Sequence, residues 1–196
     1  MFYEIEAKSH VRVPPGMFKE DIRAAIVKEL NKKYEGVISK ILGVVIGITD
    51  IVRIGEGIII PGDGAAYYDT QFRVLVFKPE LQEVMPGKVI EISDFGAFVN
   101  IGPLDGMVHI SQAMDDYVSF SKSNTLTGKE SKRTLKVGDL CKARVIAISY
   151  KDAANPKIGL TMRQLGLGKE EWLEEDKRKR EKEGKKTEDK KEEKKK

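Results

Sequence analysis

The sequence predicts two folded domains, an α+β domain in residues 1–80 and a small all-β barrel in residues 81–166, followed by a charged tail in residues 167–196. Three observations support this division. The first domain reads as a strand, an amphipathic helix and three further strands, which is typical of a helix packed on one sheet face. Short β-branched runs broken by glycine follow it. In the tail, apolar residues nearly disappear after Leu173.

The first domain begins with a strand and a helix. Apolar and polar residues alternate from Phe2 to Val13, which indicates a half-buried strand with His10 on its solvated face. Pro14-Pro15 ends this strand and suits the first turn of a helix. Apolar residues at helical spacing then predict a helix that packs on a sheet and ends before Gly36. They are Phe18, Ile22, Ala25, Ile26, Leu30 and Tyr34.

The rest of the first domain is rich in Ile, Val and Gly. Residues 37–60 predict two strands with a hairpin turn at Gly55-Glu56-Gly57, and a second tight turn at residues 61–64 precedes a strand from Tyr67 to Phe77. The glycines lie between strands and no G-K-S/T follows, so we exclude a phosphate-binding loop. An exposed Ile58-Ile59-Ile60 run beside the hairpin favours a docking surface for another protein.

The second domain opens with three predicted strands, in residues 89–92, 97–101 and 105–110. Asp94-Phe95-Gly96 separates the first two, and a bulge at Gly96 would place Phe95 and Phe98 on the same outer face. His109 lies on one side of the third strand. Exposed rings of this kind stack on unpaired bases, at about 1 to 3 kcal/mol per base. The alternative is that both phenylalanines are core residues and that His109 is structural.

The stretch GKVIEISDFGAFVNIGPLDGMVHISQ resembles the first three strands of the RNA-binding OB-fold domain first described in ribosomal protein S-one. It matches that family's F-G-A-F-V, followed by G-hydrophobic-V-H-I-S. The resemblance implies that Phe95, Phe98 and His109 contact RNA. An RRM is excluded because its aromatics would be two residues apart rather than three.

Residues 140–148 and 157–162 predict the last two strands of the barrel, and each carries basic residues on one face. If that face adjoins the aromatics, its positive charge attracts the phosphate backbone of single-stranded nucleic acid; the alternative is that these residues are ordinary solvated surface charges. The basic residues concerned are Lys142, Arg144, Lys157 and Arg163. Resemblance to the S-one family places Lys157 at a basic RNA position, whereas Ser149 and Asp152 compete for the family's acidic one.

Two segments fall outside this barrel pattern. Residues 112–136 predict a polar insertion with flexible SKSN and GKESKRT portions. The tail predicts a short helix around residues 169–182 and a disordered, mixed-charge end.

The whole of residues 1–175 is similar to the E-prime family of archaeal DNA-directed RNA polymerase subunits, on the basis of VRVPP, GEG and PGDG joined to an S-one domain. The resemblance implies a truncated ribonucleoprotein-like first domain whose tip docks into the polymerase core. It also implies a heterodimer with the smaller F subunit of the polymerase, which forms a stalk near the RNA exit. Carried over by position, the tip comprises Gly55, Gly57, Gly62, Asp63 and Gly64.

Composition narrows the function. No apolar run approaches the ~20 residues that cross a bilayer, and no secretory signal is recognisable, so we expect no membrane partner. One cysteine, Cys141, fits a reducing, cytoplasmic setting, and with two histidines we expect no metal and no cofactor. The net charge of +4 does not by itself indicate a nucleic-acid partner.

No nucleophile, base or metal-ligand pattern assembles an active site in this sequence. We therefore expect a noncatalytic RNA polymerase subunit that binds single-stranded nascent RNA and supports initiation, processivity and termination. An adaptor in translation or RNA decay that carries an S-one domain is the alternative. A ribonuclease would have to show metal-dependent cleavage.

Overall fold

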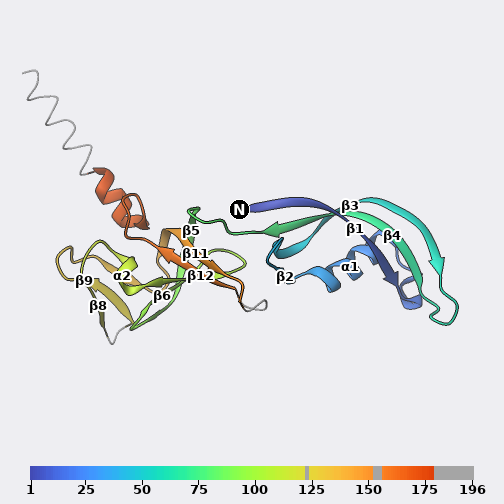
Figure 1. Cartoon of the computed structure of the whole chain (residues 1–196), viewed down its shortest axis with the longest axis horizontal. Helices are drawn as coiled ribbons and strands as arrows, with labels where there is room; N and C mark the ends of the chain where they lie inside the picture. The colour runs from blue at the N-terminus through green and yellow to red at the C-terminus, as the bar shows by residue number, and fades with distance from the viewer. Residues whose placement is uncertain (122–123, 152–155, 179–196) are drawn as a thin grey trace, which may run out of the picture. The chain divides into compact units, whose positions relative to one another are not determined.

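The computed structural model describes residues 1–121, 124–151 and 156–178 (Figure 1). The chain divides into two compact units. Unit 1 holds residues 1–80 together with the described part of 150–156, and unit 2 holds the described parts of 81–149 and 157–196. No helix of the described chain is both long enough and apolar enough to cross a bilayer.

Unit 1 is a four-stranded antiparallel sheet with one helix on it. Alternation along the first strand, β1 (Phe2–Val13), is as predicted, with Val11 and Val13 buried and His10 exposed. The helix α1 (Ile22–Tyr34) lies along one sheet face and buries Ala25, Ile26 and Leu30 against it (Figure 1). The strands follow the order β1-β4-β3-β2, with bounds β1 Phe2–Val13, β2 Ile38–Ser39, β3 Gly43–Ile59 and β4 Ala66–Phe77.

The helix of unit 1 begins later than the prolines predict. Residues Pro15–Met17 form a single 3₁₀ turn, and α1 starts only after Asp21, whose carboxylate accepts the Ala24 N–H at 3.1 Å. An N-cap of this kind satisfies a donor that the first helical turn leaves unpaired. Phe18 therefore precedes the helix and is 48% exposed, so the buried stripe is shorter than predicted.

The hairpin predicted at Gly55-Glu56-Gly57 is wrong, because β3 continues through these residues to Ile59. A bulge between Ile54 and Gly57 shifts the register against β4 instead. At Gly57 a Cβ atom would lie 2.6 Å from Cε1 of the Tyr68 ring, so this glycine makes room for a ring rather than for a turn. The actual reversal comes at residues 60–65, between β3 and β4.

Unit 2 is built on a five-stranded barrel. Its strands follow the order β12-β7-β6-β5-β11, and a further pairing between β11 and β12 closes the sheet on itself. Inward-facing apolar residues fill the interior, among them Val89, Val99, Val108, Val145 and Leu160. The bounds are β5 Val84–Ser93, β6 Gly96–Asn100, β7 Asp105–His109, β11 Leu140–Ser149 and β12 Lys157–Thr161.

The segment 112–136 is more ordered than its polar composition predicts. After α2 (Ile110–Ala113) it forms a second antiparallel sheet, in the order β10-β9-β8, with Leu126 and Leu135 fully buried. Its strands are β8 Val118–Ser121, β9 Thr125–Gly128 and β10 Thr134–Lys136. The GKESKRT portion is a turn fixed by hydrogen bonds to Asp116, and the SKSN portion lies partly outside the described residues.

The start of the tail packs on unit 2. The short strand β13 (Gly168–Lys169) pairs with β11, and residues 170–178 are helical. Trp172 is buried beneath the Arg133 guanidinium, which lies 5.7 Å from the ring centre and also bonds Asp176. The predicted helix beyond residue 178 and the predicted disordered end lie outside the described residues.

Candidate nucleic-acid interface

Two phenylalanine rings meet on the outer surface of the barrel. Phe95 lies in the two-residue loop between β5 and β6 and is 46% exposed, and Phe98 on β6 is half-buried. The ring centres are 6.0 Å apart at an interplanar angle of 87°, an edge-to-face arrangement that aromatic pairs favour. Both rings are therefore outside the core, and the edge-to-face contact fixes their orientation.

The bulge that was predicted at Gly96 lies elsewhere. The register shifts between Val89 and Glu91, so the extra residue is Ile90 on β5, whereas Gly96 keeps regular pairs with Ser93 and His109. A Cβ atom at Gly96 would lie 2.1 Å from the Val108 carbonyl oxygen. Glycine is needed here because the backbones of β6 and β7 approach closely beside the two rings.

His109 ends β7 directly beside Gly96 and is exposed. Its Nδ1 accepts the Ser111 N–H at 3.3 Å and lies 2.8 Å from the Ser111 hydroxyl, so the ring caps α2. Among the described residues, the hydrogen bonds of the His109 ring are made by Nδ1. The predicted trio of Phe95, Phe98 and His109 thus lies together on β6, β7 and the loop before them.

The predicted basic residues fall into two groups. Lys157 is on β12, which pairs with β7, and Arg163 follows the end of β12. Lys142 and Arg144 are on β11, which pairs with β5, β12 and β13 but with neither strand of the aromatics. By register Lys157 lies beside the start of β7, at Asp105, whereas His109 ends that strand and Arg163 follows the end of β12. Lys142 and Arg144 lie on a strand that pairs with neither β6 nor β7.

Two residues were predicted as candidates for the acidic position of the groove, Ser149 and Asp152. Ser149 pairs directly with Lys157 across β11 and β12. Asp152 lies outside the described residues.

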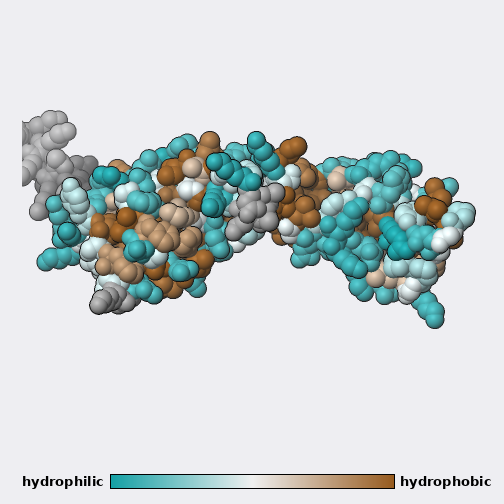
Figure 2. Space-filling view, turned by 60° about the horizontal axis from the view of Figure 1, so that its bottom comes forward, coloured by the Kyte–Doolittle hydropathy of each residue, from teal (hydrophilic) through white to brown (hydrophobic). Residues whose placement is uncertain are grey.

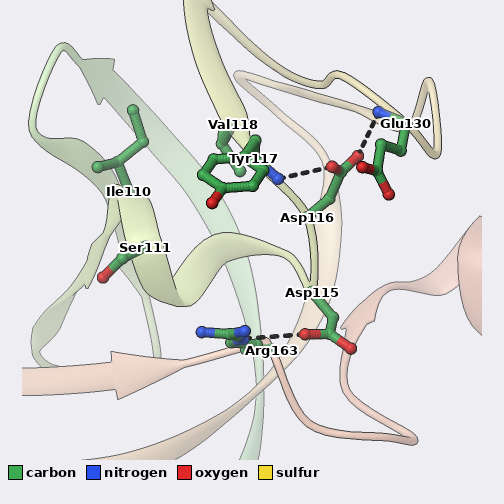
Figure 3. A pocket seen from close by; sticks show the side chains of 8 residues that line it. All are labelled: Ile110, Ser111, Asp115, Asp116, Tyr117, Val118, Glu130 and Arg163. Atoms are coloured by element: carbon green, nitrogen blue, oxygen red, sulfur yellow. Dashed lines mark hydrogen bonds and ion pairs between the residues drawn. The ribbon is translucent and has the colours of Figure 1, made fainter.

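A pocket of about 510 Å³ that the sequence reasoning missed adjoins the aromatics (Figure 3). It is lined by α2, by the segment that leads into β8 and by Arg163. The Ile110 N–H, at the pocket wall, donates to the Phe95 carbonyl oxygen at 2.9 Å. Tyr117 in this pocket is 78% exposed. The run MDDYVSF, placed just after the S-one motif, was the signal available in the sequence.

The predicted docking tip is divided by the structure. Gly62, Asp63 and Gly64 lie in the reversal between β3 and β4, whereas Gly55 and Gly57 lie within β3. Ile58, Ile59 and Ile60 are 66%, 63% and 47% exposed. Figure 2 shows apolar atoms among polar ones at the end of unit 1 that carries this hairpin.

Within the described residues, no three of the His, Cys, Asp and Glu side chains gather as metal ligands. Cys141 is buried, and burial raises the pKa of its thiol to about 12, so the thiol is neutral near pH 7.

Comparisons with known proteins cover both units. Residues 8–64 match the SHS2 domain found in the N terminus of Rpb7p/Rpc25p/MJ0397, and residues 78–155 match the S1 RNA binding domain. The fold and the outer aromatic surface thus define a two-domain protein of the class that joins these two modules.

Full-length relatives identify the family more closely. The chain is 40% identical to DNA-directed RNA polymerase subunit Rpo7 of Sulfolobus acidocaldarius, over 90% of this chain and 97% of the relative. It is 39% identical to the protein of the same name in Saccharolobus solfataricus, over 91% and 100%. It is 27% identical to DNA-directed RNA polymerase III subunit RPC8 of Bos taurus, over 79% of each. The chain belongs to the Rpo7 family of RNA polymerase subunits.

Proposed function

We propose that this chain is a noncatalytic stalk subunit of a multisubunit DNA-dependent RNA polymerase and that its barrel binds single-stranded nascent RNA. Binding of the emerging transcript would support initiation, processivity and termination. The observation that carries this proposal is the outward-facing trio on the S-one domain, in which Phe95 and His109 are exposed and Phe98 is half-buried.

The proposal assigns different surfaces to different partners. The trio stacks on bases, and Lys157 and Arg163 contact the RNA backbone. An RNA contact by Lys142 and Arg144 remains a prediction, because only an RNA strand that continues around the barrel to β11 would reach them. The hairpin tip with its exposed isoleucines docks on the polymerase core. The chain forms a heterodimer with the F subunit in the cytoplasm, and no cofactor takes part. The relatives matched over nearly their whole length are named polymerase subunits, which disfavours an adaptor of translation or RNA decay.

A triple substitution tests the RNA surface. In the full chain, Phe95→Ala, Phe98→Ala and His109→Ala together remove the stacking surface, so single-stranded RNA should bind at least about tenfold more weakly, the equivalent of roughly 1.4 kcal/mol. Fluorescence anisotropy with a labelled RNA measures the affinity. Phe18→Ala is the matched control, because it removes a similarly exposed ring from unit 1. Unchanged affinity in the triple variant would mean that RNA binds elsewhere.

A further inference from the structure

The pocket beside the aromatic trio has the composition of a nucleotide site. In Figure 3 the exposed ring of Tyr117 lies at the top of the pocket, Ile110 and the Ser111 hydroxyl lie along one side, and Arg163 lies at the bottom beside Asp115. A ring that is 78% exposed contributes little to the core, which makes it available to a ligand.

Arg163 is available to an anion. Its Nε bonds Asp115 at 3.0 Å, and the side chains of Arg163 and Asp115 are 54% and 77% exposed. Pairs this exposed contribute little to stability, so the guanidinium can exchange partners at small cost. The pair uses Nε, and in Figure 3 the terminal nitrogens point away from Asp115, toward the side on which Ser111 lies.

The acidic residues of the pocket do not make it a cation site. Asp116 accepts the Tyr117, Glu130 and Ser131 N–H groups and the Ser131 hydroxyl, at 2.6 to 2.9 Å. These hydrogen bonds, that of the Ser131 backbone foremost, lower the pKa of Asp116 and fully occupy its carboxylate. In Figure 3 Asp116 and Glu130 lie beyond Tyr117, on the side away from Ile110. The rest of the pocket therefore carries an aromatic ring, apolar and hydroxyl groups, and the Arg163 guanidinium with its partner Asp115.

The pocket is continuous with the trio. Ile110 directly follows His109, and its N–H bonds the Phe95 carbonyl. Ser111, which lines the pocket, bonds Nδ1 of His109. His109, Ile110 and Ser111 therefore join the trio directly to the wall of the pocket. Continuity with a base-stacking surface favours RNA over a basic peptide as the occupant.

We propose that this pocket holds one further nucleotide of the same single RNA strand, with its base stacked on Tyr117 and its phosphate at Arg163. The inference rests on the proposed RNA-binding function of the trio and lengthens that RNA path onto the segment between α2 and β8. Asp115, once released by Arg163, is free to accept hydrogen bonds from a base amino group.

Tyr117→Ala in the full chain tests this site with two uridine-rich RNAs, one of about four and one of about 12 nucleotides, which bracket the sites that OB folds cover. Affinity for the longer RNA should fall about tenfold and affinity for the shorter one should hardly change. Tyr117→Phe keeps the ring and should bind like the wild type, and Phe18→Ala again serves as the exposed-ring control. A plot of log affinity against log salt concentration has a negative slope, and Arg163→Gln should make this slope shallower by about 0.7, the value for one phosphate contact on a single strand.

The outcomes separate this site from the function on which it rests. Unchanged binding of the longer RNA by Tyr117→Ala, with weakened binding by the triple variant of the trio, overturns the pocket and leaves the RNA-binding function intact. Loss of polymerase association with unchanged RNA affinity also overturns it, because the pocket would then contact protein. If the triple variant itself binds RNA normally, both proposals fail.

Discussion

A single carboxylate fastens the hairpin tip of unit 1 to the neighbouring strand. Asp63 receives two hydrogen bonds from the Arg12 guanidinium, at 2.9 and 2.5 Å, and one from the Tyr67 hydroxyl at 2.6 Å. A bidentate pair of this kind fixes geometry as well as charge. Asp63, predicted as a docking residue, thus holds the tip in shape, and we assign the proposed docking contact to the isoleucines beside it.

The Asp63 cluster predicts a pH dependence of stability. The hydrogen bond from Arg12, then that from Tyr67, holds the pKa of Asp63 well below the unfolded value of about 4. A carboxyl whose folded pKa is depressed stabilises the fold above its unfolded pKa, and this stability is lost as the pH falls toward the folded pKa. Asp63→Asn should therefore lower the free energy of unfolding at pH 7, and the difference from wild type should shrink at pH 3. Urea denaturation at both pH values measures it; a difference that is the same at both would contradict the ion pair.

The insertion sheet is the element that the polar composition concealed. Leu126 on β9 and Leu135 on β10 are fully buried neighbours in register. Together they form the apolar centre of the small sheet whose leading segment carries Tyr117. Two leucines among many polar residues produce a weak pattern in sequence, yet both are completely excluded from water.

Leu135→Ala should lower the free energy of unfolding by about 2 to 5 kcal/mol, because it removes a buried side chain and leaves a cavity. Urea denaturation measures the loss, and amide hydrogen exchange should show it concentrated in β8, β9 and β10. Val137→Ala is the matched control: this neighbour is 51% exposed, and the change should stay within about 0.5 kcal/mol. Equal effects of both substitutions would argue against a packed insertion.

Local patterns predicted the elements better than their ends and contacts. The alternation along β1 and the outward position of Phe95 and Phe98 depend on near neighbours, and the structure agrees with them. Gly57 looked like a turn residue because the ring it accommodates, that of Tyr68, comes from the next strand. Such a pairing is invisible to local turn chemistry.

The candidate site was predictable to the same extent. The F-G-A-F-V motif and the G-M-V-H-I-S run that follows it indicated the trio because all three residues lie within 15 positions of one another. The separation of Lys142 from the aromatics follows from closure of the barrel through β11 and β12, which strand alternation alone does not reveal. The pocket at Tyr117 joins residues more than 40 positions apart, such as Asp115 and Arg163, and no spacing rule brings these together.

At the scale of the whole molecule, the two units have different proposed functions: unit 1 attaches to the polymerase and unit 2 binds RNA. Each unit has its own buried core, so a surface change in one should leave the other folded. The proposed functions should therefore be separable by substitution. The aromatic triple variant should still associate with polymerase while binding RNA poorly.

The reciprocal variant is Ile59→Lys at the tip. Placing a charge where an apolar side chain would be buried removes about 1.5 to 3 kcal/mol of binding free energy. Association with the polymerase core should therefore weaken roughly tenfold or more, and RNA affinity should be unchanged. Co-precipitation of the large polymerase subunits with the full chain measures association. Ile41→Lys is the control, because Ile41 is 77% exposed and lies near the start of β3 rather than at its end. Normal association of Ile59→Lys, or equal loss in both variants, would show that the hairpin tip is not the docking surface.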